Sequence, residues 1–161
     1  MAGNIFNAAE IVDIGIAKEK KRRDFYRLAA ENFREPEIKK LFAQLADWEE
    51  THIRKFIEIR NSFSEAETTE SYPGELEAYM NSLVDEKLYG RISAEWFGRN
   101  VASVPDAVRY GIEFEKDAIL FFNELAKLTA GSQPEKIQLL IDEEKKHLVY
   151  LSELRRKYAA G

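Results

Sequence analysis

Residues 134–158 read PEKIQLLIDEEKKHLVYLSELRRKY, and this stretch decides the fold. Its apolar residues recur every three or four positions, which predicts an amphipathic helix with one buried stripe. Glu144 and His147 fall in the middle of that stripe, so both side chains should point into the core from one helix face. Because an ionised carboxylate is costly to bury without a counter-charge, a buried Glu-x-x-His pair indicates a bound cation.

The same arrangement occurs once more, in the helical pattern of residues 36–62. The chain has only two histidines, and both end a Glu-x-x-His on an apolar stripe. A further glutamate precedes each pair by about thirty residues, again within an apolar helical pattern. The sequence thus yields six candidate metal ligands: Glu19, Glu49, His52, Glu115, Glu144 and His147. Four carboxylates with two imidazoles suit iron or manganese better than zinc, whose tetrahedral shell holds fewer ligands.

The two halves of the pattern align as an internal repeat. Residues 16–20 match residues 112–116 with an offset of 96 (115 − 19), and residues 45–49 match residues 140–144 with an offset of 95 (144 − 49). Such pseudosymmetry would place equivalent ligands on opposite sides of one axis. The repeat therefore predicts a centre of two metal ions.

The order of the predicted helices indicates the fold class. Helical periodicity covers residues 7–33, 36–62, 105–129 and 134–158, and the short links within each pair predict two antiparallel hairpins, 7–62 and 105–158. The segment 63–104 is long enough to cross the whole bundle, and we expect an additional helix in it from about residue 74 to 90. We predict one all-α domain over residues 1–161, a ferritin-like four-helix bundle of two hairpins joined by a long crossover.

Composition narrows the function classes. The net charge of -5 argues against a nucleic-acid-binding surface, and the absence of cysteine excludes disulfides, iron–sulfur clusters and thiolate zinc sites within this chain. No apolar run approaches a membrane span, and no signal peptide is recognisable, so we expect a soluble, cytoplasmic protein without membrane contact. Apolar residues in the crossover favour a homodimer.

These motifs resemble the rubrerythrin branch of the ferritin-like superfamily, and the resemblance covers both hairpins. It implies that the glutamate of each Glu-x-x-His, Glu49 or Glu144, bridges the two metals. Each upstream glutamate and each histidine would then bind one metal. The resemblance also implies that Tyr26, seven residues after Glu19, makes a hydrogen bond near the site, and the repeat has Phe122 in its place.

Two departures from that family bear on mechanism. Rubrerythrins carry an extra glutamate linked to a redox-dependent ligand exchange, where this chain has Ala118, and the matching position of the first half is Arg22. The resemblance therefore favours a six-ligand centre as in other ferritin-like proteins. The four cysteines of a rubredoxin domain are also absent, so electrons would come from a separate donor protein or from Fe(II) itself.

Asp47 and Asp142 stand two residues before the predicted bridging glutamates. They could accept hydrogen bonds from the histidines and fix their tautomers, or they could be acids of the helix surface.

The sequence leaves three functions open. The first is a di-iron oxidoreductase, of peroxidase or ferroxidase type, that passes electrons from two Fe ions to dioxygen or hydrogen peroxide. The second is a non-catalytic protein that binds or stores iron or manganese. The third is a structural bundle that retains the ligands without using them. Manganese or a mixed Fe/Mn pair would be alternative cofactors.

Overall fold

The computed structural model describes residues 8–62, 92–128 and 134–159, which contain five helices and no strand. The helices are α1 (Ala8–Asn32), α2 (Pro36–Asn61), α5 (Ala94–Asn100), α6 (Val104–Leu128) and α7 (Pro134–Ala159). The four long helices begin and end within one residue of the predicted positions. The all-α class is therefore confirmed.

The helix starts follow from local chemistry. Pro36 and Pro134 occupy the first positions of α2 and α7, where the missing N–H of proline has no intrahelical partner to lose. Ser103 accepts a hydrogen bond from the backbone N–H of Asp106 at 3.4 Å at the start of α6. The helix expected at residues 74–90 lies outside the described residues, whereas the short α5 lies within the described part of the crossover.

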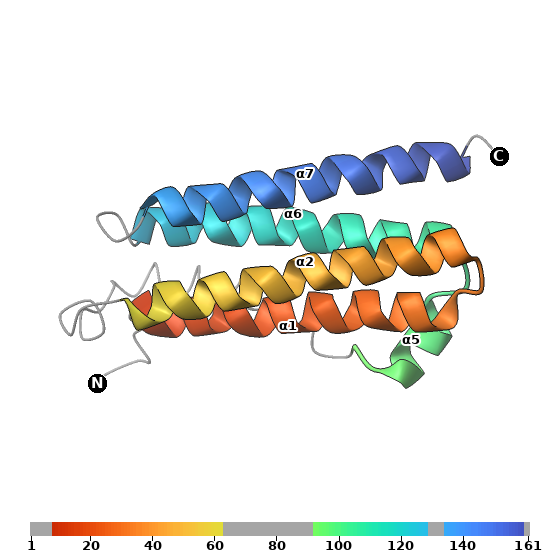
Figure 1. The fold of residues 1–161 in the computed structure, drawn as a ribbon, viewed down its shortest axis with the longest axis horizontal. Coiled ribbons are helices and arrows are strands. Elements are labelled where there is room, and N and C mark those ends of the chain that lie inside the picture. Colours follow the sequence, from red (N-terminus) through yellow and green to blue (C-terminus); the bar gives the residue numbers. More distant parts are fainter. Residues whose placement is uncertain (1–7, 63–91, 129–133, 160–161) are drawn as a thin grey trace, which may run out of the picture.

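The long helices pair as two antiparallel hairpins, α1 with α2 and α6 with α7 (Figure 1). The hairpins pack together chiefly through α1 and α6, with further contacts between α2 and α7. α2 and α6 run in the same direction along the bundle, so α6 begins at the end opposite to the one where α2 finishes (Figure 1). This order requires the predicted crossover between the hairpins.

Buried side chains divide the bundle into three layers. One apolar cluster, which includes Phe25, Phe42 and Phe114, lies toward the α1–α2 turn. A second cluster, which includes Phe56 and Phe121, lies toward the other end. Between them is a layer of fully buried charged residues: Glu19, Arg22, Glu49, Glu115 and Glu144. None of the described helices is long and apolar enough to span a membrane.

Candidate metal centre

The four predicted carboxylates meet in the charged layer, one from each long helix. Glu19 comes from α1, Glu49 from α2, Glu115 from α6 and Glu144 from α7, and none of them has exposed surface. The two histidines close the same layer, with His52 2% and His147 6% exposed. All six predicted ligands are therefore brought together.

The atoms around His52 form one half of the site. Its Nδ1 lies 2.5 Å from Glu144 Oε1, 3.7 Å from Glu49 Oε2 and 3.9 Å from Glu19 Oε2. We call these four atoms the His52 subsite.

The atoms around His147 form the other half. Its Nδ1 lies 3.4 Å from Glu144 Oε2, 3.8 Å from Glu49 Oε1 and 3.8 Å from Glu115 Oε2. We call these atoms the His147 subsite. Glu49 and Glu144 thus direct one oxygen to each subsite, whereas Glu19 and Glu115 each serve a single one.

Most of these inward atoms lack a hydrogen-bond partner among the described residues. Both carboxylate oxygens of Glu49 and Glu144, one oxygen each of Glu19 and Glu115, and Nδ1 of both histidines are buried without a hydrogen bond, and ion pairs between the histidines and carboxylates relieve this in part. Glu49, His52, Glu144 and His147 can also bring ligand atoms within 4.8 Å of one another. Because buried polar atoms without partners are costly, this oxygen and nitrogen donor set fits a pair of cations.

Without cations, protons balance the charge of the layer. Burial disfavours the charged form of His147, but its contacts with Glu115 and Glu144 outweigh burial and raise its pKa to about 10. Burial also opposes the charge on His52, yet Glu144 and Glu143 raise the pKa of its imidazole well above the usual range. Burial and the nearby Glu144 raise the pKa of Glu115 to about 8. The metal-free site therefore holds exchangeable protons on several predicted ligands at neutral pH.

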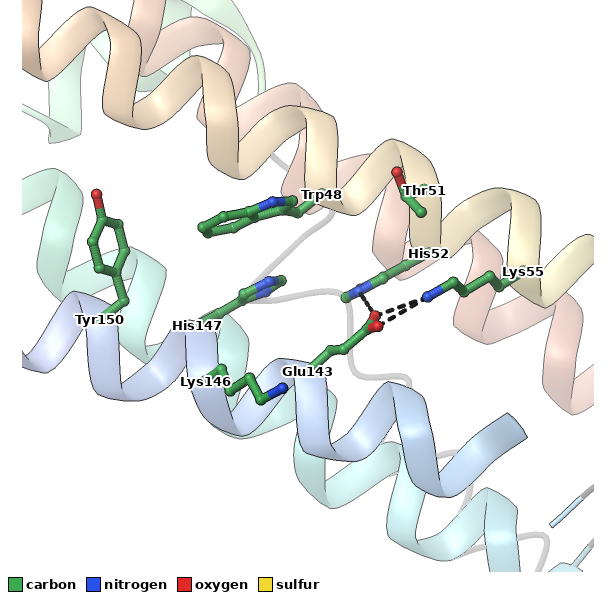
Figure 2. Close-up of a pocket in the computed structure, with 8 residues that line it drawn as sticks. All are labelled: Trp48, Thr51, His52, Lys55, Glu143, Lys146, His147 and Tyr150. Atoms are coloured by element: carbon green, nitrogen blue, oxygen red, sulfur yellow. Dashed lines mark hydrogen bonds and ion pairs between the residues drawn. The ribbon is translucent and has the colours of Figure 1, made fainter. Parts of the chain in front are cut away.

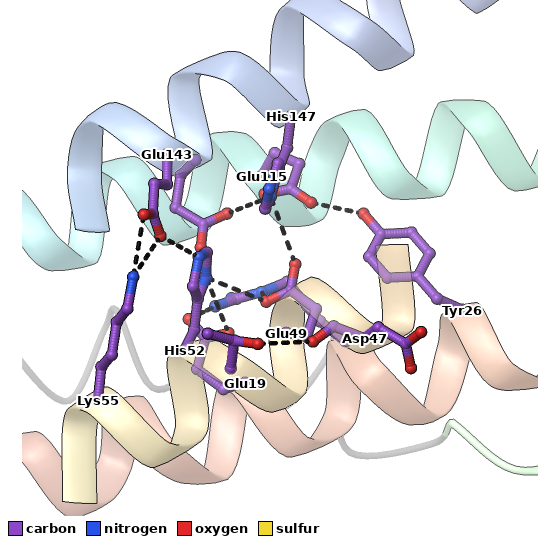
Figure 3. Close-up of polar contacts among 12 residues, drawn as sticks. Glu19, Tyr26, Asp47, Glu49, His52, Lys55, Glu115, Glu143 and His147 are labelled. Carbon is purple, nitrogen blue, oxygen red and sulfur yellow. Dashed lines mark hydrogen bonds and ion pairs between the residues drawn. The ribbon is translucent and has the colours of Figure 1, made fainter. Parts of the chain in front are cut away.

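Two polar side chains of α1 contact Glu115 and Glu19, the two glutamates that each serve a single subsite. Tyr26 donates a hydrogen bond of 2.6 Å from its hydroxyl to Glu115 Oε1, across the bundle (Figure 3). This contact agrees with the hydrogen bond that the sequence resemblance implied. Arg22 donates from Nη2 to Glu19 Oε1, and its Nε lies 3.7 Å from Glu49 Oε2. The sequence singled out Arg22 only as a departure from the family, not as a residue of the site.

Each histidine is also contacted from outside, by a residue of the opposite hairpin. Glu143 Oε2 accepts from His52 Nε2 at 2.7 Å, and Lys55 in turn donates to Glu143 at 3.0 Å (Figure 3). The bonds from His52 and Lys55 lower the pKa of Glu143 to about 2. Trp48 stacks on His147 with 4.7 Å between ring centroids and an interplanar angle of 8°.

The predicted role of Asp47 and Asp142 beside the histidines is wrong. Both are exposed, and Asp142 accepts a hydrogen bond of 3.0 Å from Gln138. Because each helical residue turns by about 100°, a residue two positions before a ligand points almost away from it. The residue directly before Glu144 is better placed, and Glu143 contacts His52 instead.

A cleft between α2 and α7 leads to the histidines from outside. It has a volume of about 420 Å³, with His52, His147 and Glu143 among its lining residues. Trp48, Tyr150 and two lysines, Lys55 and Lys146, complete much of its lining (Figure 2). A small molecule entering here would meet the imidazole side of the charged layer.

Comparisons with known proteins agree with this geometry. The family model Rubrerythrin matches residues 10–154 of the chain. The structure is similar to a crystal structure from Thermotoga maritima described as a ferritin-like diiron-carboxylate protein, with a TM-score of 0.76 and 25% sequence identity. That similarity covers 98% of this chain and 99% of the other. No curated protein sequence matches the chain.

Proposed function

Because the chain belongs to the rubrerythrin family, we propose that it is a di-iron carboxylate oxidoreductase that reacts with dioxygen or hydrogen peroxide. One observation carries the proposal. Glu49 and Glu144 each turn one oxygen toward His52 and one toward His147, at 2.5 to 3.8 Å from the two Nδ1 atoms. This arrangement supports two metal positions that share two bridging carboxylates.

The surrounding residues would hold the ligands in productive orientations. Glu143 accepts a hydrogen bond from Nε2–H of His52, so Nδ1 is the nitrogen that would lose its proton and bind a metal. Tyr26 fixes one oxygen of Glu115 and leaves the other facing His147. Two ferrous ions bound here would supply the two electrons that dioxygen or peroxide accepts.

Access and electron supply complete the proposal. The cleft beside His52 and His147 would admit the small oxidant, while the apolar layers above and below exclude water from the carboxylates. We expect a separate protein to return electrons between turnovers and the chain to act as a homodimer.

An iron titration tests the proposal. Metal-free protein would be titrated with Fe(II) without oxygen, then exposed to oxygen or peroxide while its ultraviolet–visible spectrum is recorded. Saturation at two irons per chain, a new ferric band and sustained peroxide consumption with excess reductant would support it. A single round of oxidation without turnover would favour the storage function. No iron binding would refute the di-iron function and leave only manganese for the second function, which a Mn(II) titration would then test.

A pair of neighbouring variants controls for indirect effects. Glu144→Ala removes a proposed bridging ligand and should abolish oxygen-reactive iron. Asp142→Asn changes an exposed carboxylate two residues earlier on the same helix and should leave iron binding and oxidation unchanged. Full activity in Glu144→Ala would mean that the reaction occurs elsewhere.

A further inference from the structure

The two halves of the charged layer differ at one repeat-related pair of positions. Arg22 follows Glu19 by three residues, and Ala118 follows Glu115 by three. Both are fully buried, but only the first carries a charge. The guanidinium of Arg22 pairs with Glu19 and lies 3.7 Å from Glu49, so both of these carboxylates of the His52 subsite already contact a cation.

The His147 subsite is held by a neutral group instead. Glu115 receives the hydroxyl of Tyr26, and the repeat position of Tyr26 near the His52 subsite is Phe122. The ring of Phe122 faces Arg22, with 5.7 Å between the ring centroid and the guanidinium carbon. The one positive charge that the described residues place on Glu115 is the proton of His147, which an entering metal displaces, whereas Arg22 keeps its charge.

We propose that Arg22 is a positioning residue that makes the two subsites unequal, so that the His147 subsite takes its metal first and the His52 subsite second. This inference rests on the proposed di-iron function. A cation in the His52 subsite must share Glu19 and Glu49 with the guanidinium, and charges repel strongly where little water separates them. The same ion pair keeps Glu19 Oε2 turned toward His52 before the second metal arrives.

Glu143 should raise the metal affinity of the His52 subsite, which opposes the effect of Arg22, but its influence is weaker. Its carboxylate strengthens His52 as a ligand, which would favour the His52 subsite. However, its side chain is 27% exposed and its charge is paired with Lys55. Arg22 is fully buried and contacts the ligands directly, so its effect should dominate.

Anaerobic titration with Co(II) tests this order, because the visible bands of Co(II) report binding without any turnover. The wild-type protein should bind two ions in two steps, with dissociation constants separated by about tenfold or more. Glu19→Gln should keep the first step and lose the second, whereas Glu115→Gln should weaken the first. Two equal steps, or loss of the first step in Glu19→Gln, would overturn the inference but not the di-iron function.

Variants of Arg22 test the cause. Arg22→Gln keeps a hydrogen-bond donor but removes the charge, so the two Co(II) dissociation constants should become similar. Arg22→Lys keeps the charge and should keep them apart. Unchanged separation in Arg22→Gln would overturn the role of Arg22. If that variant does not fold by circular dichroism, the Glu19→Gln and Glu115→Gln titrations decide. Absence of Co(II) and Fe(II) binding in the wild type would refute the proposed function together with this inference.

Discussion

Tyr26 is fully buried, and its hydroxyl donates to Glu115, so its contribution to metal binding can be isolated by removing one oxygen atom. Tyr26→Phe should weaken metal binding in the His147 subsite. A hydrogen bond to a charged acceptor contributes about 1.5–3 kcal/mol, and the bond also exists without metal. The loss in affinity is therefore the part gained when Glu115 becomes a charged ligand, at most about 10- to 100-fold. The measurement is an anaerobic Fe(II) or Co(II) titration.

A second tyrosine provides the control. Tyr110 packs by its ring against Phe25 and Phe114 in the same apolar cluster, and Tyr110→Phe should leave metal affinity unchanged. Equal losses in both variants would show that the effect comes from packing rather than from the bond to Glu115.

The protonated ligands predict a steep pH dependence of metal binding. His147 has its pKa raised to about 10 and Glu115 to about 8, and the pKa of His52 is raised further. All three are therefore largely protonated at pH 6 to 7 in the metal-free protein, and a metal must displace these protons. Affinity should rise with pH, by about tenfold per pH unit for each proton released. Calorimetry in buffers of different ionisation enthalpy counts the protons, and a pH-independent affinity would contradict this assignment.

At the scale of elements, the short helix α5 packs against α1 through two aromatic side chains, the buried Phe97 and the half-buried Trp96. Phe97 is 1% exposed, and its ring centroid lies 5.5 Å from that of Phe25. Phe25 is the residue directly before Tyr26 in the sequence. Phe97→Ala should cost about 3–5 kcal/mol in the free energy of unfolding, because it leaves a cavity in this cluster. Urea denaturation measures the loss.

The neighbouring glycine serves as a matched control for α5. A methyl group on Gly98 would meet nothing within 4 Å, so Gly98→Ala should change the free energy of unfolding by no more than about 1 kcal/mol. If Phe97→Ala had an equally small effect, α5 would not contribute to the stability of the cluster.

The helices and the ligand set could be predicted because both depend on local periodicity. The apolar stripes defined the buried faces, Pro36 and Pro134 marked two helix starts, and the placement of Glu144 and His147 within a stripe put them in the core. The contacts between helices could not be predicted in the same way. Helical geometry alone turns Asp142 away from the site, but that Glu143 reaches His52 depends on how α7 packs against α2.

Arg22 shows a second limit of sequence patterns. An arginine three residues after Glu19 normally suggests an exposed ion pair on the helix surface. Its full burial follows only from the packing of α1 against α2 and α6, which also brings Glu49 and Phe122 to it. Aligning the two halves of the sequence showed that Arg22 stands where the second half has Ala118. It did not show that the Arg22 side chain lies among the predicted metal ligands.

At the scale of the whole molecule, the charged layer joins all four long helices at one level between two apolar clusters. In the metal-free protein, protonated histidines, Arg22 and Tyr26 link the carboxylates of this layer, although many of its inward oxygens lack a hydrogen bond. Bound metals would link α1, α2, α6 and α7 through one carboxylate each. Metal binding should therefore raise the free energy of unfolding above the value that the apolar clusters provide on their own.

Thermal unfolding tests this dependence. Mn(II), or Fe(II) without oxygen, should raise the melting temperature, and a chelator should reverse the rise. At a thousand times the dissociation constant, mass action adds about 4 kcal/mol, or roughly 8–16 °C for a chain of this size. The double variant Glu49→Gln with Glu144→Gln lacks both proposed bridges and should show almost no rise. A rise of wild-type size in that variant would place the bound metal on the protein surface, because the layer would then hold only two carboxylates for two cations.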